Sequence, residues 1–183
     1  MITSRRFTAD CVRCCGLCCV APTFDAEQGF GYTKSAHTPC ANLSADNRCT
    51  IHDALPARGF ASCATFDCHG AGQRVTRLFA GKSWRSSPEL ARRMFQAYFR
   101  YRALHELMAL LELAIPQAPP SDAERLRERL QSLDTLCETG AALDDSVRIG
   151  QLRREVLLEV RRALAPSASS PSAQRAPNAP SSL

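Results

Sequence analysis

Cysteine is concentrated in the first part of this sequence. Nine of the ten cysteines lie between residues 10 and 73, and three of the four histidines lie in the same stretch. Thiolates and imidazoles two or three residues apart can bind one ion, because a short loop folds back on itself at that spacing. The predicted metal ligands are Cys11, Cys14, Cys15, Cys18, Cys19, Cys40, Cys49, Cys63, Cys68 and His52.

Three short motifs have the spacing of metal-binding knuckles. They are Cys11-Val-Arg-Cys14, Cys15-Gly-Leu-Cys18 and Cys49-Thr-Ile-His52. Gly16 suits such a turn, since glycine adopts positive φ without a Cβ clash. If the backbone at Cys18-Cys19 is extended, the two side chains point to opposite sides. They would then serve two metals, or one of them would be a bystander. For His52, a surface imidazole is the alternative to a ligand.

Length and composition describe an ordinary globular chain. The 183 residues suit either one domain or a small metal-stapled module joined to a helical one. Hydrophobic residues make up 45% and charged residues 22%. No apolar run approaches the roughly 20 residues of a membrane helix, so we expect no membrane span.

The first ten residues lack the apolar segment of a secretory signal. This predicts a cytoplasmic protein, in which a dense cysteine cluster indicates metal binding or redox chemistry rather than structural disulfides. A secreted disulfide framework is the alternative, since ten cysteines would pair evenly.

Positive charge is concentrated in the middle of the chain. Between residues 71 and 105 there are eight Lys or Arg and one acidic residue, Glu89, interleaved with aromatic residues. Such a mixture could bind nucleic acid through phosphate contacts and stacking. The aromatic spacing is helical, however, which favours a helix with its aromatics inward and its arginines outward.

Helical signals dominate the second half. Ser87-Pro88-Glu89 has the order of a helix start, and apolar residues recur every three or four positions to about Ala114. A second helix is predicted from a capping box at Ser121 to Gly140, and a third over 143–164. Cys137 lies on a buried stripe as a small apolar filler, and His105 is a core or boundary residue rather than a ligand.

The predicted fold is therefore mainly α, with a small loop-rich cysteine module packed on about three amphipathic helices. We expect a metal-binding module over 1–73, a helical domain over 74–164 and a disordered tail over 165–183. The helices could also bind a protein partner or form a homodimer. Around the module we expect a short strand at Thr50-Ile51, a hinge at 70–72, and either a strand or irregular chain over 74–85.

Residues 10–73 resemble a bacterial family of cysteine-cluster proteins described as zinc- or iron-chelating domains. The signature is C-x-x-C-x-x-C-C, followed by P-C-x-x-L, C-x-I-(Tyr or His) and two later cysteines. A nearer likeness is to the cysteine-rich segment at the front of some bacterial pentapeptide-repeat proteins. The shared motifs are Gly16-Leu17-Cys18-Cys19, Phe66-Asp67-Cys68 and Gly70-Ala-Gly-Gln73.

The resemblance implies metal chelation rather than a reaction. The sequence departs from the family pattern in three ways. Cys14 is followed by three residues before Cys18, so either Cys14 or Cys15 takes the family position. His52 stands where tyrosine is common, and pentapeptide repeats are missing.

Four functions compete at this stage. The first is a protein with one or two thiolate-rich zinc sites of structural role, because zinc accepts closed shells of four thiolates. The second is an iron-sulfur protein that transfers electrons or senses oxidants, although the spacings match no ferredoxin run. The others are a thiol oxidoreductase and a nucleic-acid-binding regulator acting through 74–102. No hydrolase motif is present, and the sequence nominates no catalytic base or substrate.

Overall fold

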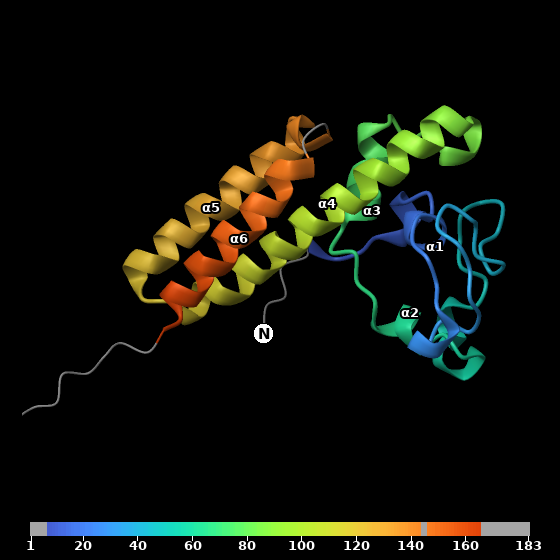
Figure 1. Ribbon diagram of the computed structural model, residues 1–183, viewed down its shortest axis with the longest axis horizontal. Helices are drawn as coiled ribbons and strands as arrows, with labels where there is room; N and C mark the ends of the chain where they lie inside the picture. The colour runs from blue at the N-terminus through green and yellow to red at the C-terminus, as the bar shows by residue number, and fades with distance from the viewer. Residues whose placement is uncertain (1–6, 144–145, 166–183) are drawn as a thin grey trace, which may run out of the picture.

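The computed structural model describes residues 7–143 and 146–165. Within these ranges the chain is mainly α, as predicted, and contains no strand, only two isolated bridges, Phe24↔Lys34 and Leu43↔Cys49. The cysteine-rich loops and the shorter helices gather at one end, and two long helices lie at the other (Figure 1). The predicted cap at 144–145, and the predicted tail apart from residue 165, lie outside the described residues.

The cysteine-rich end is made of very short elements. Its helices are α1 (Leu17–Val20), α2 (Ala61–Thr65) and α3 (Ala71–Leu78). Between them, single 3₁₀ turns cover Cys11–Arg13, Ala26–Gln28, His52–Ala54 and Pro56–Arg58. Most backbone hydrogen bonds here close turns, so this end has little regular structure to hold it together.

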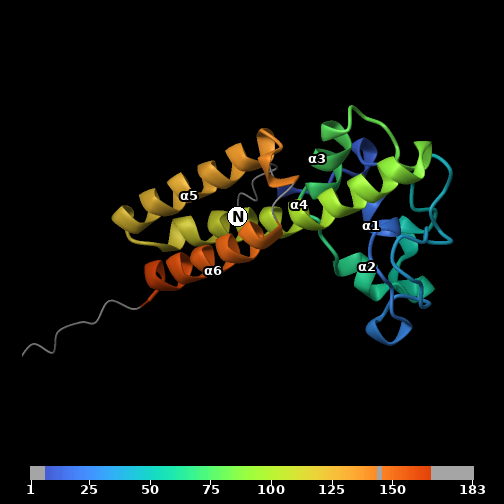
Figure 2. The same cartoon turned by 45° about the horizontal axis from the view of Figure 1, so that its top comes forward.

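Helix α4 (Pro88–Ala114) is the longest element and runs through both ends of the molecule (Figure 2). Ser87 caps it, since its Oγ accepts a hydrogen bond from the amide of Leu90 at 3.2 Å, and Pro88 occupies the first position, as predicted. The buried face carries Met94, Phe95, Ala97, Tyr98, Tyr101, Leu104, His105, Leu107, Met108, Leu111 and Ala114.

Two further helices cover the second half of α4. They are α5 (Pro120–Glu138) and α6 (Ser146–Ala163), with short 3₁₀ turns at Ile115–Gln117 and Ala141–Leu143. Cys137 is fully buried in this bundle, as predicted from its stripe. On α6, Val156, Val160 and Ala163 are buried, whereas the predicted seam residue Leu164 is 40% exposed.

Four local predictions are wrong. Helix α5 begins at Pro120 with no side-chain cap, so Ser121 lies inside it, because proline at the first position already fixes the helical φ. Residues 71–78 form helix α3, neither a hinge nor a strand. Thr50 lies in a turn rather than a strand. Cys18 and Cys19 lie in helix α1 rather than in extended chain.

One buried apolar cluster joins the two ends of the molecule. It includes Leu17 and Val20 of α1, Val75 of α3, Met94 of α4 and Val156 of α6. The predicted boundary near residue 73 therefore crosses a continuous core, and the division into modules remains a prediction. No helix in the described ranges is long and apolar enough to cross a membrane.

Candidate metal centres

Short elements bring the nine front cysteines into one region. Cys11 lies in the first 3₁₀ turn, Cys18 and Cys19 in α1, Cys63 in α2, and Cys68 just before α3. All ten cysteines of the chain are free thiols.

Cys11, Cys14, Cys18 and Cys68 form what we call the first thiol set. Gly72 on α3 marks its floor, because a Cβ built there would lie 2.7 Å from the Cys14 sulfur and 3.8 Å from the Cys68 sulfur. Burial raises the pKa of Cys14 to about 11, and the neighbouring Cys68 thiol raises it further. Burial and Cys68 likewise raise the pKa of Cys11.

Cys19, Cys40, Cys49 and Cys63 form the second thiol set. Burial raises the pKa of Cys63 to about 11, and the thiols of the other three members add to the effect. Burial, Cys19 and Cys40 also raise the pKa of Cys49. The backbone holds the set together, since the Cys40 amide donates to the Cys19 carbonyl oxygen at 2.9 Å, and Cys49 bridges to Leu43.

Cys18 and Cys19 connect the two sets. Their sulfur atoms are 3.8 Å apart in the single turn of α1. The contact between them is the largest cause of a raised pKa at Cys18 and of a lowered pKa at Cys19. Cys18 also feels Cys14 and Cys68, whereas Cys19 acts on the thiols of the second set. The two sets therefore meet at one dipeptide.

Backbone amides point at several of the sulfurs. The Asn42 amide donates to the Cys40 sulfur at 3.4 Å. The amides of Leu17 and Gly16 lower the pKa of Cys14 against the effect of burial, and the Ile51 amide does the same for Cys49. Such donors favour the thiolate, the form that binds metals.

Gly16 is needed for the turn at the first set. Its φ is +72°, as its place in the knuckle predicted, and a Cβ there would lie 2.8 Å from a Leu43 side-chain carbon.

Two predicted ligands lie apart from both sets. Cys15 points into the apolar core, and the Thr76 hydroxyl donates to its sulfur at 3.4 Å. The structure thus separates Cys14 from Cys15, which the sequence could not. The His52 side chain is 67% exposed, and its Nδ1 lies 3.6 Å from a carboxylate oxygen of Asp53.

Lys34 lies beside the second set and was not predicted from the sequence. Its side chain is buried, and its Nζ donates to the carbonyl oxygens of Val20, Pro22 and Ser35. Burial lowers the Lys34 pKa, whereas the thiols of Cys40, Cys19 and Cys63 act to raise it. A lone buried lysine among many surface cations gives no pattern in a single sequence.

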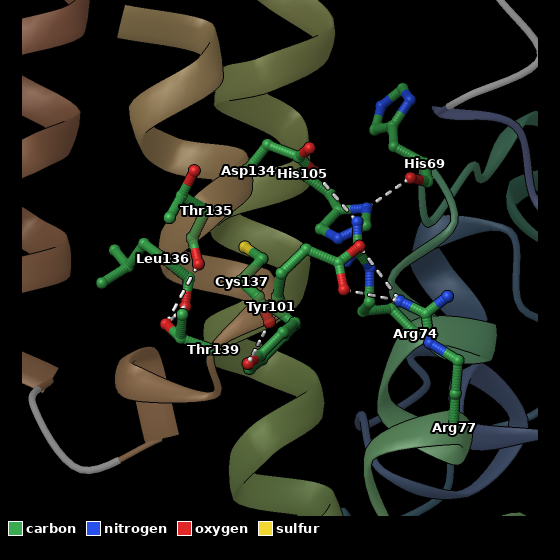
Figure 3. Close-up of polar contacts among 11 residues, drawn as sticks. His69, Arg74, Arg77, Tyr101, His105, Asp134, Thr135, Leu136, Cys137 and Thr139 are labelled. Carbon is green, nitrogen blue, oxygen red and sulfur yellow. Dashed lines mark hydrogen bonds and ion pairs between the residues drawn. The ribbon is translucent and has the colours of Figure 1, made fainter.

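The backbone next to Cys68 is held by the helical half (Figure 3). His105 Nδ1 lies 2.6 Å from the His69 carbonyl oxygen, so the ring donates there, and His105 is buried as predicted. On α3, Arg74 donates to Asp134 of α5 at 3.0 Å and pairs with Glu138. These contacts tie the end of the first set to α4 and α5.

Several cations of the basic stretch 74–102 contact groups of the protein itself. Besides Arg74, Arg77 pairs with Glu138 at 3.1 Å, and Arg102 pairs with Glu106 at 2.8 Å. Arg85 donates to the side chain of Asn47. These arginines hold elements together, which accounts for part of the predicted basic surface.

Metal binding itself is not shown by these coordinates. Over 7–143 and 146–165, no group of three or more His, Cys, Asp or Glu side chains is arranged so that it could hold a metal ion. The members of each set are electrostatic neighbours, and their sulfurs would have to draw together around an ion. The donor type fits zinc or iron, which prefer thiolates, and the glycine floor and the amide donors fit a sulfur-lined site.

The chain is thus a mainly α protein with a cysteine-rich end. It is similar to the uncharacterized protein YybG of Bacillus subtilis strain 168, with 36% identity over 152 residues. The alignment covers 81% of this chain and 54% of YybG, so it spans about half the length of that relative. No family model matches the sequence, and no solved structure matches it.

Proposed function

We propose that this chain is a metal-binding protein with two four-thiolate centres, each filled by zinc in a structural role. The division of eight thiols into two sets of four is the observation that carries the proposal. The first centre would use Cys11, Cys14, Cys18 and Cys68, and the second Cys19, Cys40, Cys49 and Cys63. Cys15 and His52 are left out of both.

A structural role follows from how little else orders this end. Its helices are single turns, and its strand pairing amounts to two isolated bridges. Closed thiolate shells supply folding free energy directly, about 10–16 kcal/mol for zinc in small modules at neutral pH. Two such centres would stabilise a segment that regular secondary structure does not.

An iron-sulfur centre is the second candidate, and the same thiols support it. Burial of the sulfurs suits a cluster as well as zinc, because solvent exclusion tunes cluster potentials. Binding of nucleic acid through 74–102 has less support, since several of those cations are engaged within the protein. A protein partner or a homodimer through the helices remains a prediction.

Metal analysis of untagged protein, purified both in air and anaerobically, tests the proposal. We expect a colourless protein with two zinc ions per chain. Brown anaerobic protein with visible absorption would replace zinc by an iron-sulfur centre.

Cys18→Ser should lose at least one ion and destabilise the front half, whereas Cys137→Ala, changed in the helical core, is the matched control and should keep both. A wild-type chain without metal, or a Cys18→Ser chain with full metal content and thermal stability, would refute the proposal.

A further inference from the structure

The hydroxyl group of Tyr98 is buried beside the first thiol set without a partner. Tyr98 is 1% exposed, and its Oη has no hydrogen-bond partner in the part of the chain that the structure describes. A buried hydroxyl in this state costs roughly 1–3 kcal/mol. Such groups are rare in folded proteins, so each calls for a physical explanation.

The surroundings of Tyr98 identify the acceptor. Tyr98 belongs to the same buried cluster as Cys68, and Cys14 and Cys18 pack against that cluster. After burial, the thiols of Cys18, Cys68 and Cys14 are the main causes that raise the Tyr98 pKa. A neutral thiol accepts hydrogen bonds weakly, whereas a thiolate accepts them well. The missing acceptor is therefore one that metal binding would create.

Arg102, one turn further along α4, adds to this observation. Its Nε is also buried without a hydrogen-bond partner among the described residues, and its guanidinium lies 4.9 Å from the centre of the Phe66 ring, two residues before Cys68. Two donors on one face of α4 thus approach the segment that supplies a ligand.

We propose that the Tyr98 hydroxyl donates a hydrogen bond to a sulfur of the first thiol set when that set holds a metal ion. This inference rests on the proposed function. Tyr98 would be a positioning residue, because it contacts a ligand and not the ion. Through it, α4 would sense whether the first centre is filled, since a bound metal turns a weak acceptor into a strong one.

Tyr98→Phe removes this hydroxyl, and Tyr101→Phe provides the matched control. Tyr101 lies on the same helix and is fully buried, but its hydroxyl donates to the Cys137 carbonyl oxygen at 3.0 Å, within the helical bundle (Figure 3). The probe is Co²⁺ added alone to metal-free full-length protein, because thiolate-to-cobalt absorption bands report on the sulfur ligands.

We expect Tyr98→Phe to weaken binding of one of the two ions by about 10-fold or more, the usual effect of losing a group that orients a ligand. The absorption band of that ion should move to lower energy, because its sulfur loses a hydrogen bond. Tyr101→Phe should leave both affinities and both bands unchanged while lowering stability. A purely structural role for Tyr98 would alter stability without moving a band.

Unchanged affinities and bands in Tyr98→Phe would overturn the inference while leaving the two centres intact. A wild-type protein that takes up no cobalt would instead refute the proposed function. If Tyr98→Phe failed to fold, wild-type protein loaded with an NMR-active isotope of cadmium would decide. The Tyr98 hydroxyl proton should then show scalar coupling to one cadmium nucleus, and its absence would refute the inference.

Discussion

Cys14 and Cys15 are adjacent in the chain but lie in different surroundings. Cys14 faces Cys68 across Gly72, whereas Cys15 is 5% exposed in the apolar core. We therefore expect Cys14→Ala to lose one metal ion per chain, with a large fall in stability. Cys15→Ala should keep both ions and cost roughly 1 kcal/mol of packing. Metal analysis and urea unfolding of both variants check this, and the reverse pattern would reassign the ligand.

Gly72 is the residue that makes room for the first set. Alanine is the better helix former by about 1 kcal/mol, so propensity alone predicts that Gly72→Ala stabilises α3. Its Cβ would lie 2.7 Å from the Cys14 sulfur, however, and the sulfur would have to move. We expect the variant to lose one ion.

Gly150→Ala on α6 is the control for Gly72, because only the Arg154 guanidinium lies near its Cβ position, at 4.0 Å. It should keep both ions and gain stability. Full metal content in Gly72→Ala would show that Cys14 is not held there.

His105 gives the stability a pH dependence. Burial lowers its pKa to about 4, with Arg74 acting in the same direction and both the hydrogen bond to His69 and the charge of Asp134 opposing. The unfolded chain takes up this proton near pH 6.5, so stability is lost as pH falls from about 6.5 towards 4. The loss should reach about 2 kcal/mol at pH 5.

Metal binding also weakens in acid, so the His105 contribution must be measured as a difference. His105→Gln keeps a donor for the His69 carbonyl but cannot be charged. Urea unfolding of both proteins at pH 7 and pH 5 should show the smaller pH effect in the variant. Equal losses would mean that His105 does not titrate in this range.

At the scale of elements, α3 joins the thiol sets to the helices. Arg74 is 11% exposed and pairs with Asp134, which is 14% exposed, across from α3 to α5. Removing one member of a largely buried ion pair is costly, so Arg74→Ala should lower the free energy of unfolding by roughly 2–4 kcal/mol. Arg77→Ala, whose side chain is 65% exposed, should cost less than about 1 kcal/mol. Thermal unfolding of the two variants compares them directly, and equal costs would exclude a structural link at Arg74.

For the whole molecule, metal removal should affect the two ends differently. The cysteine-rich end has few regular hydrogen bonds, while α5, α6 and the second half of α4 bury their own apolar faces. After treatment with a chelator, amide hydrogen exchange should become fast over 11–68 and stay slow at Leu111, Leu126 and Val156. Unchanged protection over 11–68 would mean that no ion stabilises this end.

Much of the helical half could be predicted from the sequence. Ser87 and Pro88 mark the start of α4 correctly, and the apolar spacing places Tyr98, Tyr101 and Leu104 on its buried face. These signals act within one or two turns, so they are legible without tertiary structure. Helix α3 was missed because its short sequence is rich in glycine and arginine, and its burial against α4 outweighs its propensity.

The sequence by itself determined that thiols of the right type are present in number, that Gly16 allows a tight turn, and that Cys137 is core. Only the tertiary structure decided how those thiols are divided. Cys18 and Cys19 join different sets, and Cys14 rather than Cys15 faces Cys68. The reason is that these groupings depend on residues more than 30 positions apart, whose meeting is fixed by packing against α3 and α4 and leaves no local pattern.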